Sequence, residues 1–148
     1  MSESTGTTMS EPDTAEGLRA WARGMYALEA GVELLLRAQD GQHARRGCPW
    51  VRTEDGTTWI DVDELLAGTG TMSGGERRLV AIAASLLADR PVVLSEVSGL
   101  DRSSVDLVLA AIAHAAGSHE QQTTVEITDN GPQLVRSDRG SLHPWPTR

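Results

Sequence analysis

The stretch Thr71-Met72-Ser73-Gly74-Gly75-Glu76-Arg77-Arg78 decides the centre of the fold, because it begins the most apolar helix that the sequence predicts. Ser73 is placed to cap this helix, and Glu76, three residues later, completes a capping box. The apolar residues that follow recur at helical spacing and cover much of the circumference: Leu79, Val80, Ile82, Ala83, Leu86 and Leu87. We therefore expect a central helix that is buried on several sides.

Helices and hairpins are predicted on both sides of this stretch. Helices are expected over residues 13–39, 61–66 and 101–116, each capped by the aspartate at its first position, and hairpins over residues 50–60 and 123–137. The aspartate caps are Asp13, Asp61 and Asp101, and the hairpin turns are Asp55-Gly56 and Asp129-Asn130-Gly131. The core stripe predicted for the first helix is Leu18, Trp21, Met25, Leu28, Val32 and Leu35. The stripe predicted for the last helix is Val105, Val108, Leu109, Ile112 and Ala116.

Two glycines and one short apolar run leave structural alternatives open. Gly24 and Gly31 in the first helix either mark a close approach to another element or limit the stability of the helix. Pro91 to Leu94 is either a short buried strand or an extended connection, because periodicity does not distinguish the two in so short a run.

The order of these elements predicts an α+β fold in which about three main helices pack on two β-hairpins. The hairpins are free to join into one antiparallel sheet. Residues 1–12 are expected to form a disordered tail, residues 13–141 a single domain, and residues 142–148 an extended C-terminal tail.

Composition narrows the classes of function. The formal net charge is −8, which argues against binding to nucleic acid or to an anionic membrane surface. Cys48 is the one cysteine in the 148 residues, so the chain has no internal disulfide. No long apolar run and no secretion signal occur, and we expect a cytoplasmic protein.

The central stretch resembles part of the ABC-type ATPases, in particular their SMC- and Rad50-like members. Met72 to Glu76 is similar to the signature motif Leu-Ser-Gly-Gly-Gln, and Gly99-Leu100-Asp101 is similar to the D-loop. The resemblance covers residues 72–101 only. Unpaired amides and the helix dipole suit such a helix start to phosphate binding, although the same residues also serve as an ordinary helix cap. The resemblance implies that the nucleotide of an opposite subunit would meet Ser73, Gly74, Gly75 and Glu76.

Two parts that ATP hydrolysis requires are missing. The nearest approximation to a Walker A loop is Gly70 to Gly75, which is followed by Glu76 where the loop needs a lysine. The Asp-Glu pair that follows the Walker B strand in the family is represented by Ser95-Glu96 or Glu96-Val97, so one acid is lost in either register. We expect no independent catalytic activity by the P-loop route and no cofactor in the isolated chain.

Other candidate residues give weaker signals. His114, His119 and Glu120 lie near the end of the last predicted helix. A five-residue spacing does not place two histidines on one helical face, so no metal site is predicted. Cys48 follows the basic pair Arg45-Arg46, and without a neighbouring base we expect an inert thiol.

Three functions follow from these observations. The first is a non-catalytic interaction or regulatory protein that binds a protein partner. The second is a nucleotide-site protein whose residues Ser73 to Glu76 complete, in trans, the ATP site of a separate P-loop ATPase. The third is an acidic inhibitor of a basic partner, whose binding would be sensitive to salt. The usage of Ala, Gly and Arg resembles that of accessory proteins of high-GC actinobacteria, their phages or mobile elements.

Overall fold

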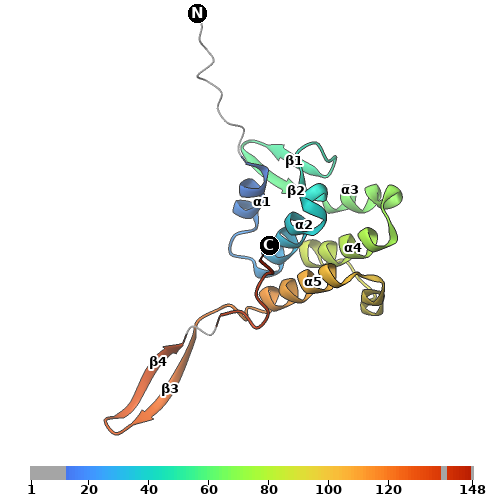
Figure 1. The fold of residues 1–148 in the computed structure, drawn as a ribbon. Helices are drawn as coiled ribbons and strands as arrows, with labels where there is room; N and C mark the ends of the chain where they lie inside the picture. The colour runs from blue at the N-terminus through green and yellow to red at the C-terminus, as the bar shows by residue number, and fades with distance from the viewer. Residues whose placement is uncertain (1–12, 138–139, 148) are drawn as a thin grey trace, which may run out of the picture.

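The computed structural model describes residues 13–137 and 140–147, so the predicted tail of residues 1–12 lies outside the described part. The fold is α+β, as predicted, with helices and two antiparallel hairpins (Figure 1). The helices are α1 (Thr14–Ala22), α2 (Tyr26–Arg37), α3 (Val62–Ala67), α4 (Gly74–Ala88) and α5 (Arg102–Ala115). The 3-10 helices are η2 (Ala38–Ala44), η3 (Gly68–Thr71) and η4 (Leu94–Gly99), and the strands are β1 (Val51–Glu54), β2 (Thr57–Ile60), β3 (Gln122–Thr128) and β4 (Gly131–Ser137).

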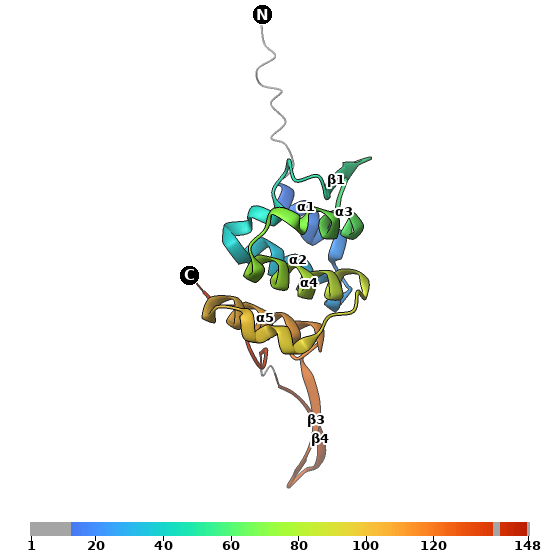
Figure 2. The ribbon, with the colours of Figure 1, turned by 90° about the vertical axis from the view of Figure 1, so that its right-hand side faces the viewer.

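Helix α4 lies at the centre of the helical body, as its apolar circumference predicted. It contacts α2, α3 and α5 and lies between α3 and α5 in Figure 2. Leu79, Val80 and Ala83 have no exposed surface. A Cβ added to Gly31 of α2 would lie 2.8 Å from Cγ of Leu87 in α4. Gly31 therefore marks a close approach between two helices, which is one of the alternatives that the sequence left open.

The first predicted helix is interrupted, so its single span over residues 13–39 is wrong. Gly24 has a φ of +93°, a left-handed conformation that glycine adopts without steric cost, and it separates α1 from α2. Leu18, Leu28 and Leu35 of the predicted stripe are buried. Met25 lies at the break and is 64% exposed, which contradicts its predicted place in the core.

The outward face of α5 also differs from the prediction. Val108 is buried as expected, but Leu109 and Ile112 are 46% and 47% exposed, and Ala116 is exposed. The buried positions are small instead: Ser104, Ala110, Ala111 and Ala113. Alanine side chains allow α5 to pack closely against α2, its main neighbour. Leu109 and Ile112 consequently face outward.

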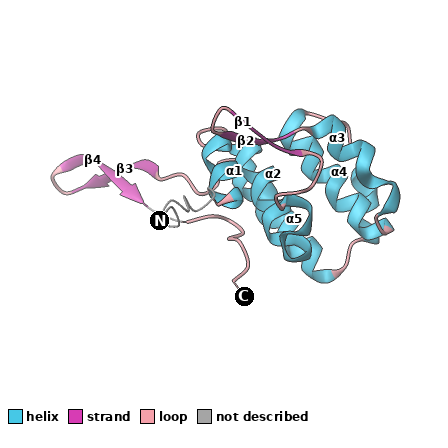
Figure 3. Ribbon diagram, turned by 90° about the horizontal axis from the view of Figure 1, so that it is seen from above, coloured by secondary structure: helices cyan, strands magenta, loops and turns pink. Residues whose placement is uncertain are grey.

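The two hairpins form separate two-stranded sheets, so the joined sheet is not formed. Hairpin β1–β2 turns at the predicted Asp55-Gly56 and packs on α1, where a Cβ added to Gly17 would lie 3.0 Å from Cβ of Thr58. Hairpin β3–β4 follows α5 and extends away from the helices (Figures 1 and 3). The hairpins are attached to different parts of the helical body, which keeps them apart.

Two connecting segments complete the described chain. Pro91 to Val93 has no strand partner and leads into η4, so this run is an extended connection rather than a strand. Residues 140–147 have neither helix nor strand, but they return to the helical body. There the guanidinium of Arg37 lies 5.0 Å from the ring centre of Trp145, and His143 Nε2 lies 2.7 Å from Oδ1 of Asp106.

Candidate functional site

The start of α4 has the predicted Ser73 cap, but among the described residues the Glu76 side chain does not complete the capping box. The Ser73 hydroxyl oxygen accepts a hydrogen bond from the Glu76 amide at 3.2 Å. Ser73 and Gly74 are exposed, so the first amides of the helix are accessible to a ligand. The phosphate-binding role of Ser73, Gly74, Gly75 and Glu76 stays a prediction.

The Glu76 side chain is directed toward η2. Its Oε2 atom accepts a hydrogen bond from Gln42 Nε2 at 3.3 Å and lies 3.2 Å from Nε2 of His43. His43 is 6% exposed, and its carbonyl accepts a hydrogen bond from the indole of Trp50 at 2.6 Å. Glu76 thus links α4 to a buried part of the chain, which is a structural use of a residue predicted to face a nucleotide.

The structure brings together the two ends of the ABC-like stretch. A Cβ added to Gly74 would lie 3.1 Å from Nη1 of Arg78, and one added to Gly99 would lie 2.5 Å from its Cζ. A Cβ added to Gly75 would lie 4.0 Å from the Gly99 carbonyl oxygen. Arg78 therefore packs against the helix start and the Gly99 turn, and both glycines make room for its guanidinium.

The acidic residues of the same stretch are not arranged for water activation. Glu96 is exposed on η4, and the strand that would position it in an ATPase is not formed. Asp101 caps α5 by accepting from the Ser104 amide at 2.8 Å and from the Ser103 hydroxyl at 2.9 Å. These hydrogen bonds hold the pKa of Asp101 below its ordinary value. Asp101 therefore serves as a helix cap, and Glu96 lies in solvent.

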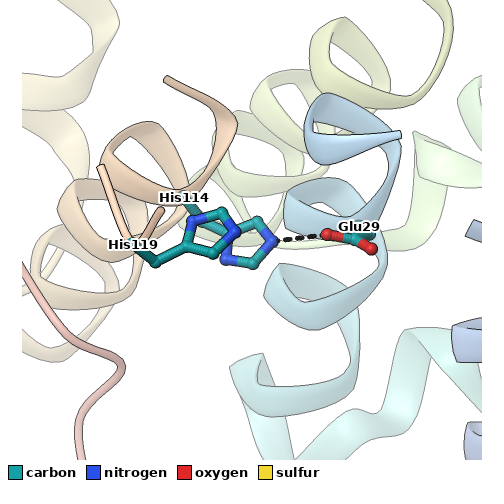
Figure 4. Close-up of side chains that lie close together, drawn as sticks. All are labelled: Glu29, His114 and His119. Atoms are coloured by element: carbon teal, nitrogen blue, oxygen red, sulfur yellow. Dashed lines mark hydrogen bonds and ion pairs between the residues drawn. The ribbon is translucent and has the colours of Figure 1, made fainter. Parts of the chain in front are cut away.

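A cluster of Glu29, His114 and His119 lies between α2 and the end of α5 (Figure 4). The helix ends at Ala115, and Gly117 with a φ of +76° reverses the chain, so His119 returns over the last turn. The two imidazoles stack with ring centres 4.0 Å apart and planes inclined by 4°. Helical spacing does not decide how these two side chains lie, because His119 is beyond the end of the helix, which the sequence places near residue 116. The turn that follows brings the two rings together.

Glu29 joins this cluster from a position 85 residues earlier in the chain. Its Oε1 atom lies 2.8 Å from His114 Nε2, and its Oε2 atom accepts from the Gly24 amide at 2.9 Å. Partial burial opposes ionisation, but these hydrogen bonds and the nearby imidazoles hold the pKa of Glu29 below its ordinary value. No local sequence signal identifies Glu29, since its partners are distant along the chain.

Surrounding groups hold the cluster in place. The ring of Tyr26 packs edge-on against both imidazoles, and its hydroxyl donates a hydrogen bond to Glu120. A cavity of about 520 Å³ opens beside Glu29, His114 and His119. Glu120, predicted to lie with the histidines, therefore contacts the cluster through Tyr26.

Cys48 shows no arrangement for nucleophilic chemistry among the described residues. Its thiol is partly buried and donates a weak hydrogen bond to the Gln42 carbonyl at 3.3 Å. Arg45 donates to the Asp40 carbonyl at 3.1 Å. These hydrogen bonds stabilise the loop that carries Cys48.

The β3–β4 hairpin has one apolar face, which we define by Val125, Ile127, Pro132 and Leu134. Val125 pairs with Leu134, and Ile127 pairs with Pro132, so all four lie on one side of the hairpin. Val125, Ile127 and Leu134 are 64%, 89% and 76% exposed. The sequence predicted the hairpin, and the alternation within its strands is the signal that could have predicted this face.

None of the described helices has the length and apolar composition needed to cross a membrane.

Comparison with known proteins gives one partial likeness. No family model matches the chain, and no solved structure matches it. The chain is similar to an ATP-dependent lipid A-core flippase of Vibrio cholerae, with 32% identity over 96 residues. The match covers 55% of this chain and 16% of the flippase. It is consistent with a partial resemblance to ABC-type ATPases, whereas the assignment of a signature segment stays a prediction.

Proposed function

We propose that this protein is a non-catalytic protein-binding module that contacts its partner through the apolar face of the β3–β4 hairpin. The observation that carries the proposal is the exposure of Val125, Ile127 and Leu134 on an element that extends from the helical body (Figure 3). A two-stranded hairpin is marginally stable in water without a covering element. A partner that covers this face would bury apolar surface and stabilise the hairpin at the same time.

The partner that fits this face is a different protein with an apolar groove and a basic rim. A second copy of the chain would carry the same formal charge of −8, so the two copies would repel each other. A basic rim would instead attract the acidic chain and speed association. The opposite face of the hairpin is more polar, with Glu126 paired to Gln133 and Thr124 paired to Val135, so the apolar face defined above is expected to be the covered one.

The binding prediction compares the two faces of the hairpin. A variant with Val125→Thr, Ile127→Thr and Leu134→Thr keeps strand-forming residues but removes the apolar face. The control carries Glu126→Thr and Gln133→Thr on the opposite face. We expect at least tenfold weaker binding for the first variant and less than threefold change for the control, since apolar burial dominates such contacts. Partners captured from the source organism are purified, and their dissociation constants are measured by calorimetry.

Three results would overturn this proposal. Equal binding of both variants would place the interface elsewhere. Self-association of the wild type in sedimentation experiments, abolished by the threonine substitutions, would make the face a contact between copies. Turnover of ATP by the purified chain would contradict its non-catalytic nature.

A second candidate function is that the start of α4 completes the ATP site of a separate P-loop ATPase. It is supported by the partial likeness to an ATP-dependent flippase and by the exposed start of α4 beside Gly99. It differs from the first candidate in requiring nucleotide between the two proteins. A helix start of this kind would meet the phosphates through its free amides.

Ser73→Arg tests this second candidate. A bulky side chain at the helix start would block a nucleotide, so stimulation of a partner ATPase is expected to fall at least tenfold. Ser73→Thr keeps both the hydroxyl and the cap and should retain stimulation. The measurement is the rate of ATP hydrolysis by the partner, with circular dichroism confirming that both variants are folded. Unchanged stimulation by Ser73→Arg would remove this candidate.

A further inference from the structure

We propose that Glu29, His114 and His119 form a binding site for a divalent first-row transition metal ion, with zinc as the best match. One ligand atom from each residue lies within 4.8 Å of the other two. Glu29 comes from α2, His114 from the last turn of α5, and His119 from the turn that follows it (Figure 4). Two imidazoles and a carboxylate are a donor set that binds such ions and leaves a coordination position open.

The distances are compatible with a metal-free form of such a site. Zinc bonds of about 2.0–2.2 Å in a tetrahedron place the ligand atoms roughly 3.3 Å apart. His114 Nε2 and Glu29 Oε1 are 2.8 Å apart because they share a hydrogen bond, which a metal ion would replace. The third ligand atom must approach the ion by rotation of His119. This residue lies beyond the end of α5, where its side chain is not fixed by the helix.

His119 has a ring nitrogen without a partner. Its Nδ1 atom is buried and has no hydrogen-bond partner among the residues that the structure describes. Burying an imidazole nitrogen without a partner is unfavourable. In Figure 4 the other ring nitrogen is the one nearer Glu29, so the His119 ring has to turn for Nδ1 to bind a cation there, and such binding would remove that cost.

Neighbouring groups orient the ligands as supporting residues do in metal sites. The Gly24 amide holds one oxygen of Glu29, and the other oxygen faces His114. Tyr26 packs edge-on against both imidazoles. The cavity of about 520 Å³ beside the cluster gives an ion access and has room for a water molecule at the open position.

The arginines of this cavity do not prevent cation binding. Arg19 and Arg37 both donate to Glu33, with distances of 2.6 Å and 3.0 Å, so one of their two positive charges is offset locally and both guanidinium groups are turned to that carboxylate. Arg23 is exposed on the cavity wall. An anion held by Arg23 and the imidazoles is the competing occupant, and the experiment below separates the two.

Calorimetric titration of zinc into the full-length, tag-free protein tests the proposal. The protein is first freed of metal with a chelator and kept at slightly alkaline pH, where imidazoles are neutral. We expect one zinc ion per chain. His119→Ala and Glu29→Gln should each weaken binding at least tenfold. His119→Cys should restore it, because a thiolate is also a zinc ligand.

His143→Ala is the matched control, since His143 also pairs with a carboxylate, that of Asp106, but has no third ligand within residues 13–137 and 140–147. It should bind zinc as the wild type does. Circular dichroism checks the fold of each variant, and cobalt absorption spectra of the wild type and of Glu29→Gln give a second readout of the coordination sphere. Absence of stoichiometric zinc binding, equal weakening by His143→Ala, or competition of zinc with inorganic phosphate for the site would overturn the proposal.

Discussion

Leu79→Ala is expected to lower the free energy of unfolding by about 3 kcal/mol. Leu79 has no exposed surface and lies in α4, which contacts three other helices. Truncation removes buried methyl groups and leaves a cavity that the surrounding helices fill only in part. Urea unfolding, followed by tryptophan fluorescence and circular dichroism, measures the change.

Leu94→Ala is the control for this prediction. Leu94 is 65% exposed on η4, so its truncation should change the free energy of unfolding by less than about 0.5 kcal/mol. If both variants were equally stable, α4 would not be the centre of the core. A larger effect of Leu79→Ala than of Leu94→Ala would explain the strong apolar pattern of α4. Most apolar residues of this helix are required for packing, whatever its first residues bind.

Glu33→Gln is expected to lower the free energy of unfolding by about 2 kcal/mol at neutral pH, between the effects of exposed and buried ion pairs. The Glu33 carboxylate accepts two hydrogen bonds from Arg19 and one from Arg37, and its side chain is 15% exposed. Arg19 and Arg37 are 49% and 35% exposed, which limits the effect through solvent screening. Urea unfolding at several pH values measures this change in the free energy of unfolding.

The contribution of Glu33 to the free energy of unfolding is expected to decrease as the pH falls. Burial opposes ionisation, but the hydrogen bonds and charges of Arg19 and Arg37 hold the pKa of Glu33 below its ordinary value of 4.5. The contribution is therefore complete above about pH 4.5 and is lost as the pH falls through the lowered pKa. The wild type and Glu33→Gln should approach each other in stability in this acidic range.

Glu64→Gln provides the comparison for Glu33→Gln. Glu64 lies 3.8 Å from Arg52, and both side chains are about half exposed. Its replacement should have an effect below about 0.5 kcal/mol at neutral pH, as is usual for exposed pairs. A stability difference for Glu33→Gln that persists unchanged into acid would contradict the role assigned to its charge.

Local signals predicted much of this fold. The caps at Asp13, Asp61, Ser73 and Asp101 are confirmed, and each side chain accepts a backbone amide. Both hairpin turns are also confirmed. These features depend on residues within a few positions of one another, so a single sequence contains the required information.

The errors concern features that depend on tertiary contacts or on one backbone angle. Periodicity identified α5 as a helix, but which side faces α2 depends on how closely alanines can pack. The break at Gly24 depends on a positive φ, which glycine permits but does not require. The cluster of Glu29 with His114 and His119 needs both a helix end and a contact between distant segments. Spacing rules for a continuous helix could not predict it.

The distribution of tryptophans has a spectroscopic consequence for the projecting hairpin. Trp21, Trp50, Trp59 and Trp145 all lie outside residues 122–137, and that segment contains no aromatic residue. Trp50 is 8% exposed and hydrogen-bonded, so its emission reports the packing of the helical body. Far-ultraviolet circular dichroism records the hairpin backbone as well. Melting of the hairpin alone would therefore alter the dichroism and leave the fluorescence unchanged, so the two signals together resolve the order in which the arm and the body unfold.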